Sequence, residues 1–276
     1  MIRFSVCNEL FEGFSWERTV AEAAAAGYAG LEVAPFTLGP APTRLSPEDR
    51  RGLRSVAEGA GLSIAGLHWL LAKTEGYHLT HADAAVRRAT ARYLGELADL
   101  CADLGGHIMV FGSPKQRSVP PGVDKADALR YAALVLSAAA DRAGERGVTI
   151  CMEALPLEET DFVNTVAEAA ELVGVVGHDN CKLMVDVKSM CSEASSFGEL
   201  IALAGPNLRH VHANDENRRG PGMGETDFTE VAAALAAVGY DGWVSVEPFD
   251  YSPDPVTVAR ESLRYLESVF EHRGQT

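Results

Sequence analysis

The sequence predicts an α/β fold, in the form of a single (β/α)8 TIM barrel that spans residues 1–276. Short segments rich in Val, Ile and Leu alternate with longer helical patterns along the whole chain, which is typical of parallel strands joined by helices. Many of the helical patterns end in glycine, the residue favoured just after a helix. The competing fold, a doubly wound sheet, usually has a glycine-rich turn after its first strand, and residues 7–10 (CNEL) have none.

The predicted elements form eight strand–helix pairs, the number that closes a (β/α)8 barrel. A helix end with glycine, followed directly by an apolar strand, recurs at 21–33, 56–69, 101–112, 142–154 and 234–248. The strands are expected at 2–6, 29–33, 62–67, 107–111, 148–153, 182–186, 208–212 and 243–247. The helices are expected at 15–26, 46–60, 83–104, 124–146, 165–176, 196–204, 228–238 and 254–271.

Composition and charge limit the classes of partner. The chain has 47% hydrophobic and 23% charged residues, as ordinary globular proteins do, and a formal net charge of −15. This excess of negative charge disfavours nucleic acids and anionic membranes, because both require a positive surface. The five cysteines are scattered without a CxxC pair, a pattern typical of reduced thiols. With neither a signal-peptide pattern nor an apolar run of membrane-spanning length, we expect a cytoplasmic protein.

Four residues of the type that binds metal ions each end an apolar strand segment. They are Glu153, Asp186, His212 and Glu247, at the ends of the fifth to eighth predicted strands. In a (β/α)8 barrel these ends meet on one face, where active sites lie, and neighbouring strands are only ~5 Å apart. Three carboxylates and one imidazole favour a divalent cation, with Mn²⁺ preferred and Mg²⁺ or Co²⁺ as alternatives. The alternative is four unrelated polar residues that face solvent.

With these four residues at its strand ends, the chain resembles the xylose isomerase-like barrel superfamily of sugar isomerases and epimerases. Within that superfamily it resembles the ketose 3-epimerases that act on tagatose and psicose. The resemblance covers essentially the whole chain. It implies that Glu153, Asp186, His212 and Glu247 bind the metal. It also implies a small carbohydrate substrate, and a homo-oligomer as one option, since dimers and tetramers are common in that family.

The same resemblance implies several substrate contacts. Arg218 and Glu159 occupy the places of a substrate-binding Arg and Glu in the ketose 3-epimerases. Those enzymes have a sugar-binding His where this chain has Ser189, with Lys188 beside it. This departure leaves the ketohexose itself in question. From its position alone, Lys188 could hold a carbonyl oxygen or a phosphate, or pair with Glu153 or Glu193. His68, at the end of the third strand, could bind substrate or pack at the barrel mouth.

The candidate residues also suggest a reaction. Inversion or migration beside a sugar carbonyl requires removal of a proton from the neighbouring carbon, and a metal ion would stabilise the resulting enediolate. Glu153 and Glu247 are the expected catalytic acid and base, one on each side of the substrate. The predicted function is therefore a metal-dependent isomerase or epimerase on a keto-sugar or sugar phosphate. The alternative is a lyase, dehydratase or hydratase on a 3-keto-glycoside or inosose. A non-catalytic sugar-binding protein is a further alternative, whereas the negative charge argues against a nuclease.

Two other positions leave two interpretations open. Glu32, at the end of the second strand, could orient a substrate or a metal-binding residue, or form a structural salt bridge. The segment 113–117 (SPKQR) follows the fourth strand and contains two basic residues. It could contact a phosphate or a hydroxyl group, but an exposed loop is the preferred interpretation.

Overall fold

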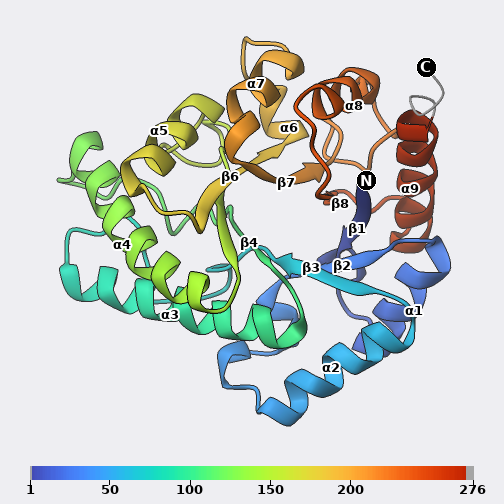
Figure 1. Cartoon of the computed structure of the whole chain (residues 1–276), viewed down its shortest axis with the longest axis horizontal. Helices are drawn as coiled ribbons and strands as arrows, with labels where there is room; N and C mark the ends of the chain where they lie inside the picture. The colour runs from blue at the N-terminus through green and yellow to red at the C-terminus, as the bar shows by residue number, and fades with distance from the viewer. Residues whose placement is uncertain (1, 272–276) are drawn as a thin grey trace.

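The computed structural model describes residues 2–271, and these residues form a closed parallel barrel whose strands follow one another in sequence order (Figure 1). The predicted (β/α)8 TIM barrel is confirmed. The strands are β1 (Arg3–Cys7), β2 (Gly30–Val33), β3 (Ser63–Leu67), β4 (Ile108–Phe111), β5 (Thr149–Met152), β6 (Cys181–Asp186), β7 (Leu208–Ala213) and β8 (Trp243–Val246). β1 pairs with both β2 and β8, which closes the ring.

The α-helices lie around the barrel as an outer ring (Figure 1). Each long helix agrees with its predicted range to within one or two residues. The α-helices are α1 (Trp16–Ala26), α2 (Pro47–Gly59), α3 (Ala84–Leu104), α4 (Lys125–Glu145), α5 (Val166–Val176), α6 (Val187–Met190), α7 (Phe197–Ala204), α8 (Phe228–Ala237) and α9 (Pro255–Glu271).

Local sequence explains where the helices begin and end. Gly27, Gly105 and Gly177 follow α1, α3 and α5 in the left-handed conformation, as the glycine pattern predicted for the first two. At the other end, a side-chain oxygen accepts a hydrogen bond from a backbone N–H of the first turn, which satisfies a group that has no partner inside the helix. The residues that do so before the seven longer helices from α1 to α8 are Ser15, Ser46, Asp83, Asp124, Thr165, Ser196 and Asp227.

Five short elements were not predicted from the sequence. Four are 3₁₀ helices: η1 (Asn8–Phe11), η2 (Pro35–Leu38), η3 (Pro42–Arg44) and η4 (Gly205–Asn207). The fifth is the four-residue helix α6, which begins directly after β6 because Asp186 accepts a hydrogen bond from the backbone N–H of Ser189. Elements of three or four residues are too short to show a helical period in sequence.

The barrel interior is filled below the site. A small apolar cluster of Ile108, Val110, Cys151 and Met184 comes from β4, β5 and β6. Because side chains alternate along a strand, Cys151 and Met184 face the same way as the residues two positions later, Glu153 and Asp186. The polar groups of the site therefore rest on a packed floor, as is usual for this fold.

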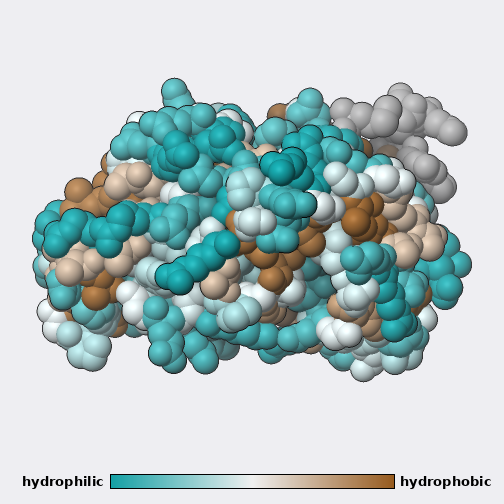
Figure 2. All heavy atoms as spheres, turned by 90° about the horizontal axis from the view of Figure 1, so that it is seen from below, coloured by the Kyte–Doolittle hydropathy of each residue, from teal (hydrophilic) through white to brown (hydrophobic). Residues whose placement is uncertain are grey.

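The outer surface fits the composition. On the face shown in Figure 2, hydrophilic side chains predominate and the hydrophobic ones form small, separate groups. Between residues 2 and 271, no helix combines the length and the apolar composition needed to cross a membrane.

Candidate active site

Four side chains predicted to bind metal come together at the carboxyl ends of β5 to β8. One ligand atom from each of Glu153, Asp186, His212 and Glu247 lies within 4.8 Å of the others, and all four residues are buried. Glu153 and Glu247 directly follow β5 and β8, while Asp186 ends β6 and His212 lies in β7. Consecutive parallel strands thus deliver the four groups to one point. We call them the ligand cluster.

The ligand cluster brings three carboxyl groups and one imidazole together in a buried site. Burial raises the pKa of Glu153 well above its ordinary value, and the nearby Glu247 carboxylate raises it further. Burial also raises the pKa of Glu247, although His212 opposes that shift. Removing carboxylates from water is costly unless a positive charge compensates them. A divalent cation at the centre of the cluster would supply that charge.

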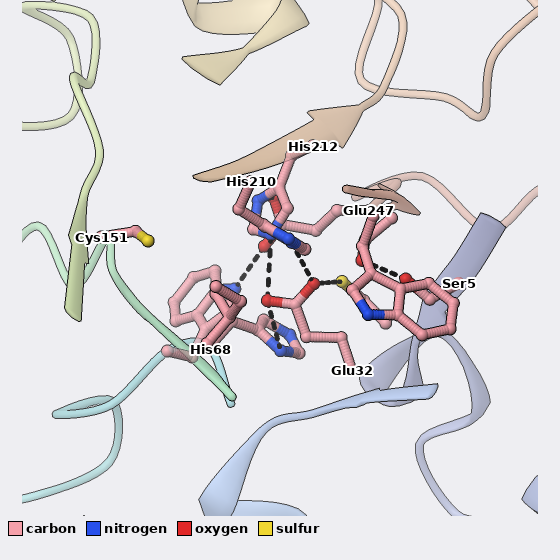
Figure 3. Close-up of polar contacts among 12 residues, drawn as sticks. Ser5, Glu32, His68, Cys151, His210, His212 and Glu247 are labelled. Atoms are coloured by element: carbon pink, nitrogen blue, oxygen red, sulfur yellow. Dashed lines mark hydrogen bonds and ion pairs between the residues drawn. The ribbon is translucent and has the colours of Figure 1, made fainter. Parts of the chain in front are cut away.

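The geometry at His212 supports a cation at the same point (Figure 3). Its Nε2 lies 3.2 Å from Glu32 Oε1, and its Nδ1 lies 2.9 Å from Glu247 Oε2. The Nδ1 atom nevertheless has no hydrogen-bond partner among the described residues. If Nε2 carries the proton and donates it to Glu32, Nδ1 presents a lone pair to a carboxylate. Burial would lower the pKa of His212, but the Glu247 and Glu32 carboxylates raise it well above its ordinary value, which favours a second proton on Nδ1; a divalent cation bound to both atoms would take the place of that proton. The residues therefore fit a divalent metal ion.

Glu32 orients this imidazole. It is fully buried, and it also accepts a hydrogen bond from His210 at 2.7 Å. Burial would raise the pKa of Glu32, but the imidazoles of His210 and His212 hold it well below its ordinary value. An ionised carboxylate on the far nitrogen of a metal-binding histidine fixes the ring and its tautomer. Of the two interpretations drawn from sequence, the contact to His212 favours the first, orientation of a ligand residue.

The other members of the ligand cluster are also held by neighbours. Asn214 donates to Asp186 Oδ2 at 2.6 Å, and the indole N–H of Trp69 donates to Glu247 Oε1 at 3.0 Å. A Cβ atom at Gly112, just after β4, would lie 1.8 Å from Glu153 Oε2. Glycine at position 112 is therefore what allows the Glu153 carboxylate to occupy its place.

A cavity of about 260 Å³ opens over the ligand cluster. This volume is slightly below the ~300–1,000 Å³ of sites for drug-sized ligands, so it suits a small molecule. The four predicted substrate-binding residues all line it, together with Glu153, His212 and Glu247; those four residues are His68, Glu159, Lys188 and Arg218. We call it the inner cavity.

Two side chains in the wall of the inner cavity, Lys188 and Glu159, form an ion pair. The Lys188 ammonium is 2.5 Å from Glu159, so its partner is neither Glu153 nor Glu193, the two glutamates expected from the sequence. Burial lowers the pKa of Lys188, but Asp186 and Glu159 together raise it above its ordinary value, which keeps the group charged. Lys188 lines the cavity, whereas the buried hydroxyl of Ser189 has no hydrogen-bond partner within residues 2–271.

His68 lies deeper in the site. Its Nε2 is 2.7 Å from Glu9 Oε2, and both residues are buried. Burial would lower the pKa of His68, but the contact with Glu9 raises it above its ordinary value. The His68 imidazole is therefore held by the carboxylate of Glu9, in the short helix η1 that follows β1, and it lines the inner cavity.

The structure corrects the prediction that segment 113–117 is an exposed loop. Arg117 is completely buried, so the exposed loop preferred from the sequence is wrong for this residue. Its guanidinium donates to backbone carbonyl groups, among them those of Glu153 at 2.6 Å and Val163 at 3.0 Å. Arg117 thus fixes the backbone of a ligand residue. Lys115, by contrast, is exposed at the wall of the inner cavity.

Three site residues were missed in the sequence. Trp69 and Gly112 lie just after strands and His210 lies in β7. A signal existed for His210, because it is two residues before His212 and must face the same side of β7. The contacts of Glu9 and Trp69 join residues far apart in the chain, and no local pattern announces them.

The closed parallel barrel and the polar cluster at its carboxyl end define the class of protein, a (β/α)8 barrel whose candidate site lies where such barrels have their active sites. Comparison with known protein families identifies the family within this class. The chain matches the xylose isomerase-like TIM barrel model over residues 20–269. The protein therefore belongs to the xylose isomerase-like TIM barrel family.

Individual relatives agree with the resemblance to ketose 3-epimerases. The D-psicose 3-epimerase of Agrobacterium fabrum (strain C58) is 37% identical over 176 residues, which cover 62% of this chain and 60% of that protein. The L-ribulose 3-epimerase of Mesorhizobium japonicum is 30% identical over 62% of this chain and 58% of that protein. The chain thus spans less than two thirds of the length of these curated relatives in the matched regions.

Solved structures match over nearly the whole chain. A crystal structure of D-psicose 3-epimerase in the presence of D-fructose superposes with a TM-score of 0.86 at 26% identity, covering 97% of this chain and 99% of that one. The predicted resemblance to this group of barrels is confirmed.

Proposed function

We propose that the protein is a divalent-metal-dependent epimerase that acts on a small keto-sugar or its phosphate. The observation that carries the proposal is the pair of carboxylates, Glu153 and Glu247, which belong to the ligand cluster and also line the inner cavity. The D-psicose and L-ribulose 3-epimerases among the relatives support a ketose as the class of substrate.

The proposed metal site consists of Glu153, Asp186, His212 and Glu247. Oxygen-rich donors with one imidazole favour Mn²⁺, with Mg²⁺ and Co²⁺ as alternatives. When bound, the ion would polarise the substrate carbonyl and stabilise negative charge on its oxygen. Glu32 would keep His212 in the orientation that binding requires.

The proton transfers are assigned to the two carboxylates. One of them, Glu153 or Glu247, removes the proton from the carbon beside the carbonyl, which leaves an enediolate. If the other returns a proton to the opposite face of the same carbon, the centre is inverted. Burial raises the pKa of both groups, and a divalent ion in the ligand cluster would offset that shift by stabilising their charged forms. The indole N–H of Trp69 holds one oxygen of Glu247, so the other oxygen is the one directed at the ligand cluster.

The remaining polar groups would position the sugar. Arg218, His68 and the Lys188–Glu159 pair line the inner cavity and can donate to or accept from hydroxyl groups. The inner cavity is small enough that binding there displaces most water from the reacting carbon. Such exclusion strengthens every electrostatic interaction in the site.

A second candidate function uses the same residues. The charged Lys188 lines the cavity next to Ser189, which stands where the ketose 3-epimerases have a sugar-binding histidine, and the Lys188 ammonium could protonate a departing oxygen. After proton removal beside a ketone, loss of that oxygen would make the protein a lyase or dehydratase on a 3-keto-glycoside or inosose. Lys188 is the observation that favours it.

Proton NMR in D₂O separates the two functions. The Mn²⁺-loaded protein is incubated with ketohexoses, ketopentoses, their phosphates, inososes and 3-keto-glucosides. We expect deuterium to enter the carbon beside the carbonyl as the epimeric sugar forms. Loss of water or of a glycosidic group would instead establish the lyase. A metal-loaded protein that exchanges no proton in any of these compounds would refute both.

A further inference from the structure

A second cavity adjoins the inner cavity at the barrel mouth. It has a volume of about 490 Å³, and we call it the outer cavity. The two cavities share five wall residues, so a ligand in one can extend into the other; the shared residues are Trp69, Pro114, Lys115, Arg218 and Phe249. A monosaccharide held over the ligand cluster would therefore have a larger space next to it.

Most charges in the walls of the two cavities are already balanced. Lys188 pairs with Glu159 at 2.5 Å, and Lys73 pairs with Glu12 at 2.9 Å. Glu9 lies 2.7 Å from His68. Glu153, His212 and Glu247 belong to the ligand cluster, where a divalent ion would offset the carboxylates.

Two positive charges are left over, and both lie where the cavities join. In the part of the chain that the structure describes, neither the Lys115 ammonium nor the Arg218 guanidinium takes part in an ion pair or a side-chain hydrogen bond. The Arg218 guanidinium lies over the ring of Phe249, 5.5 Å from its centroid. In a chain with a net charge of −15, these two cations give the junction a local positive charge.

The backbone at this junction is held in an uncommon conformation. Among residues 2–271, four residues other than glycine have a positive φ, and three of them line the cavities: Trp69 (52°), Lys73 (57°) and Arg218 (70°). Such bulky residues adopt this conformation at an energetic cost, and only where the surroundings enforce it.

Hydrogen bonds show what enforces it at Arg218. Its N–H donates to the carbonyl of Asp215 at 2.8 Å. Its own carbonyl accepts from the N–H groups of Phe249 and Asp250, at 2.8 and 2.9 Å. The loop after β7 is thereby fastened to the loop after β8, which fixes the backbone from which the exposed Arg218 side chain extends at the junction.

We propose that Lys115 and Arg218 form an anion-binding subsite where the two cavities join, so that the preferred substrate carries a phosphate or carboxylate group beyond its reacting carbons. This inference rests on the proposed function, because it assigns the far end of the same substrate. A guanidinium and a neighbouring ammonium are a suitable pair for anionic oxygens, since the first binds two oxygens in a plane and the second adds charge.

The test compares matched substrates. For wild type, Lys115→Gln and a control, Arg92→Gln, kcat/KM is measured by deuterium exchange for a neutral ketose, its terminal phosphate and the corresponding sugar acid. Arg92 is exposed on α3 and has no ion pair within residues 2–271, so its replacement removes the same charge elsewhere. Loss of one charge-assisted contact should reduce the preference for the anionic substrate by about tenfold in Lys115→Gln. Arg92→Gln should keep the preference.

The outcomes separate this inference from the proposed function. Equal kcat/KM for the neutral and both anionic sugars in the wild type would overturn the subsite and leave the epimerase intact. A preference for the phosphate over the carboxylate, or the reverse, would identify the source of the anion.

If no sugar turns over, the proposed function fails and binding decides the inference. Calorimetric titration of the Mn²⁺-loaded protein with inorganic phosphate should then give a dissociation constant about tenfold weaker for Lys115→Gln than for Arg92→Gln. Equal constants for the two variants would overturn the subsite.

Discussion

Replacing Gly112 with alanine tests how closely the position of Glu153 controls the reaction. The added Cβ would lie 1.8 Å from Glu153 Oε2, whereas real Cβ contacts essentially never fall below 3.0 Å. The carboxylate must therefore retreat by about 1.2 Å. Because Oε2 is the far end of a flexible side chain, the fold can accept the change at a cost of no more than ~1–3 kcal/mol. A misplacement of about 1 Å in a reacting group can lower the rate by about 100-fold.

The assay is kcat/KM for epimerisation in D₂O, with thermal unfolding measured in parallel. Gly174→Ala is the matched control, because Gly174 lies in α5 with no atom within 4 Å of the added Cβ. We expect Gly112→Ala to lose about 100-fold in kcat/KM while its melting temperature stays close to that of the wild type. Wild-type activity in Gly112→Ala would refute a role for Glu153 that depends on its position.

Three further predictions concern the ligand cluster. Glu247→Gln removes a base at little change in volume, so turnover should fall at least ~1,000-fold with the fold intact, and undiminished deuterium exchange would rule out the two-carboxylate mechanism. Asp186→Asn should lower bound Mn²⁺, measured by mass spectrometry of the metal content. Asp99→Asn, on α3 where Asp99 pairs with Arg142 of α4, should not. Full occupancy in Asp186→Asn would remove Asp186 from the site. For a protein kept at a metal concentration near 100 times the dissociation constant of the ion, chelation should lower the free energy of unfolding by ~2–3 kcal/mol. An unchanged melting temperature after chelation would contradict a structural effect of the ion.

Most of the fold could be predicted because its signals are local. Alternating strand and helix patterns, with Gly27 and Gly105 at helix ends, gave the order and approximate bounds of the long elements. Parallel strands in sequence order then bring the residues after β5 to β8 together with no further information. The short helix α6 lacks such a pattern, because it exists through a single side-chain bond from Asp186.

The supporting residues of the site were harder to predict, because they depend on contacts across the barrel. Glu32 and His210 are 178 positions apart in sequence, as are Trp69 and Glu247. Arg117 looked like a surface residue next to Lys115, yet it is buried among backbone carbonyls that only the folded loops assemble. Local sequence identifies the residue types that do chemistry, but not the ones that hold them.

A crystal grown with Mn²⁺ and measured at the manganese absorption edge tests the central claim most directly. The anomalous difference map should show one strong peak bound by Glu153, Asp186, His212 and Glu247. A second group, Cys7, Glu9, His68 and Glu247, also has ligand atoms within 4.8 Å of one another. A peak on that group instead, or none at either place, would contradict the assignment of the metal site on which the proposed reaction depends.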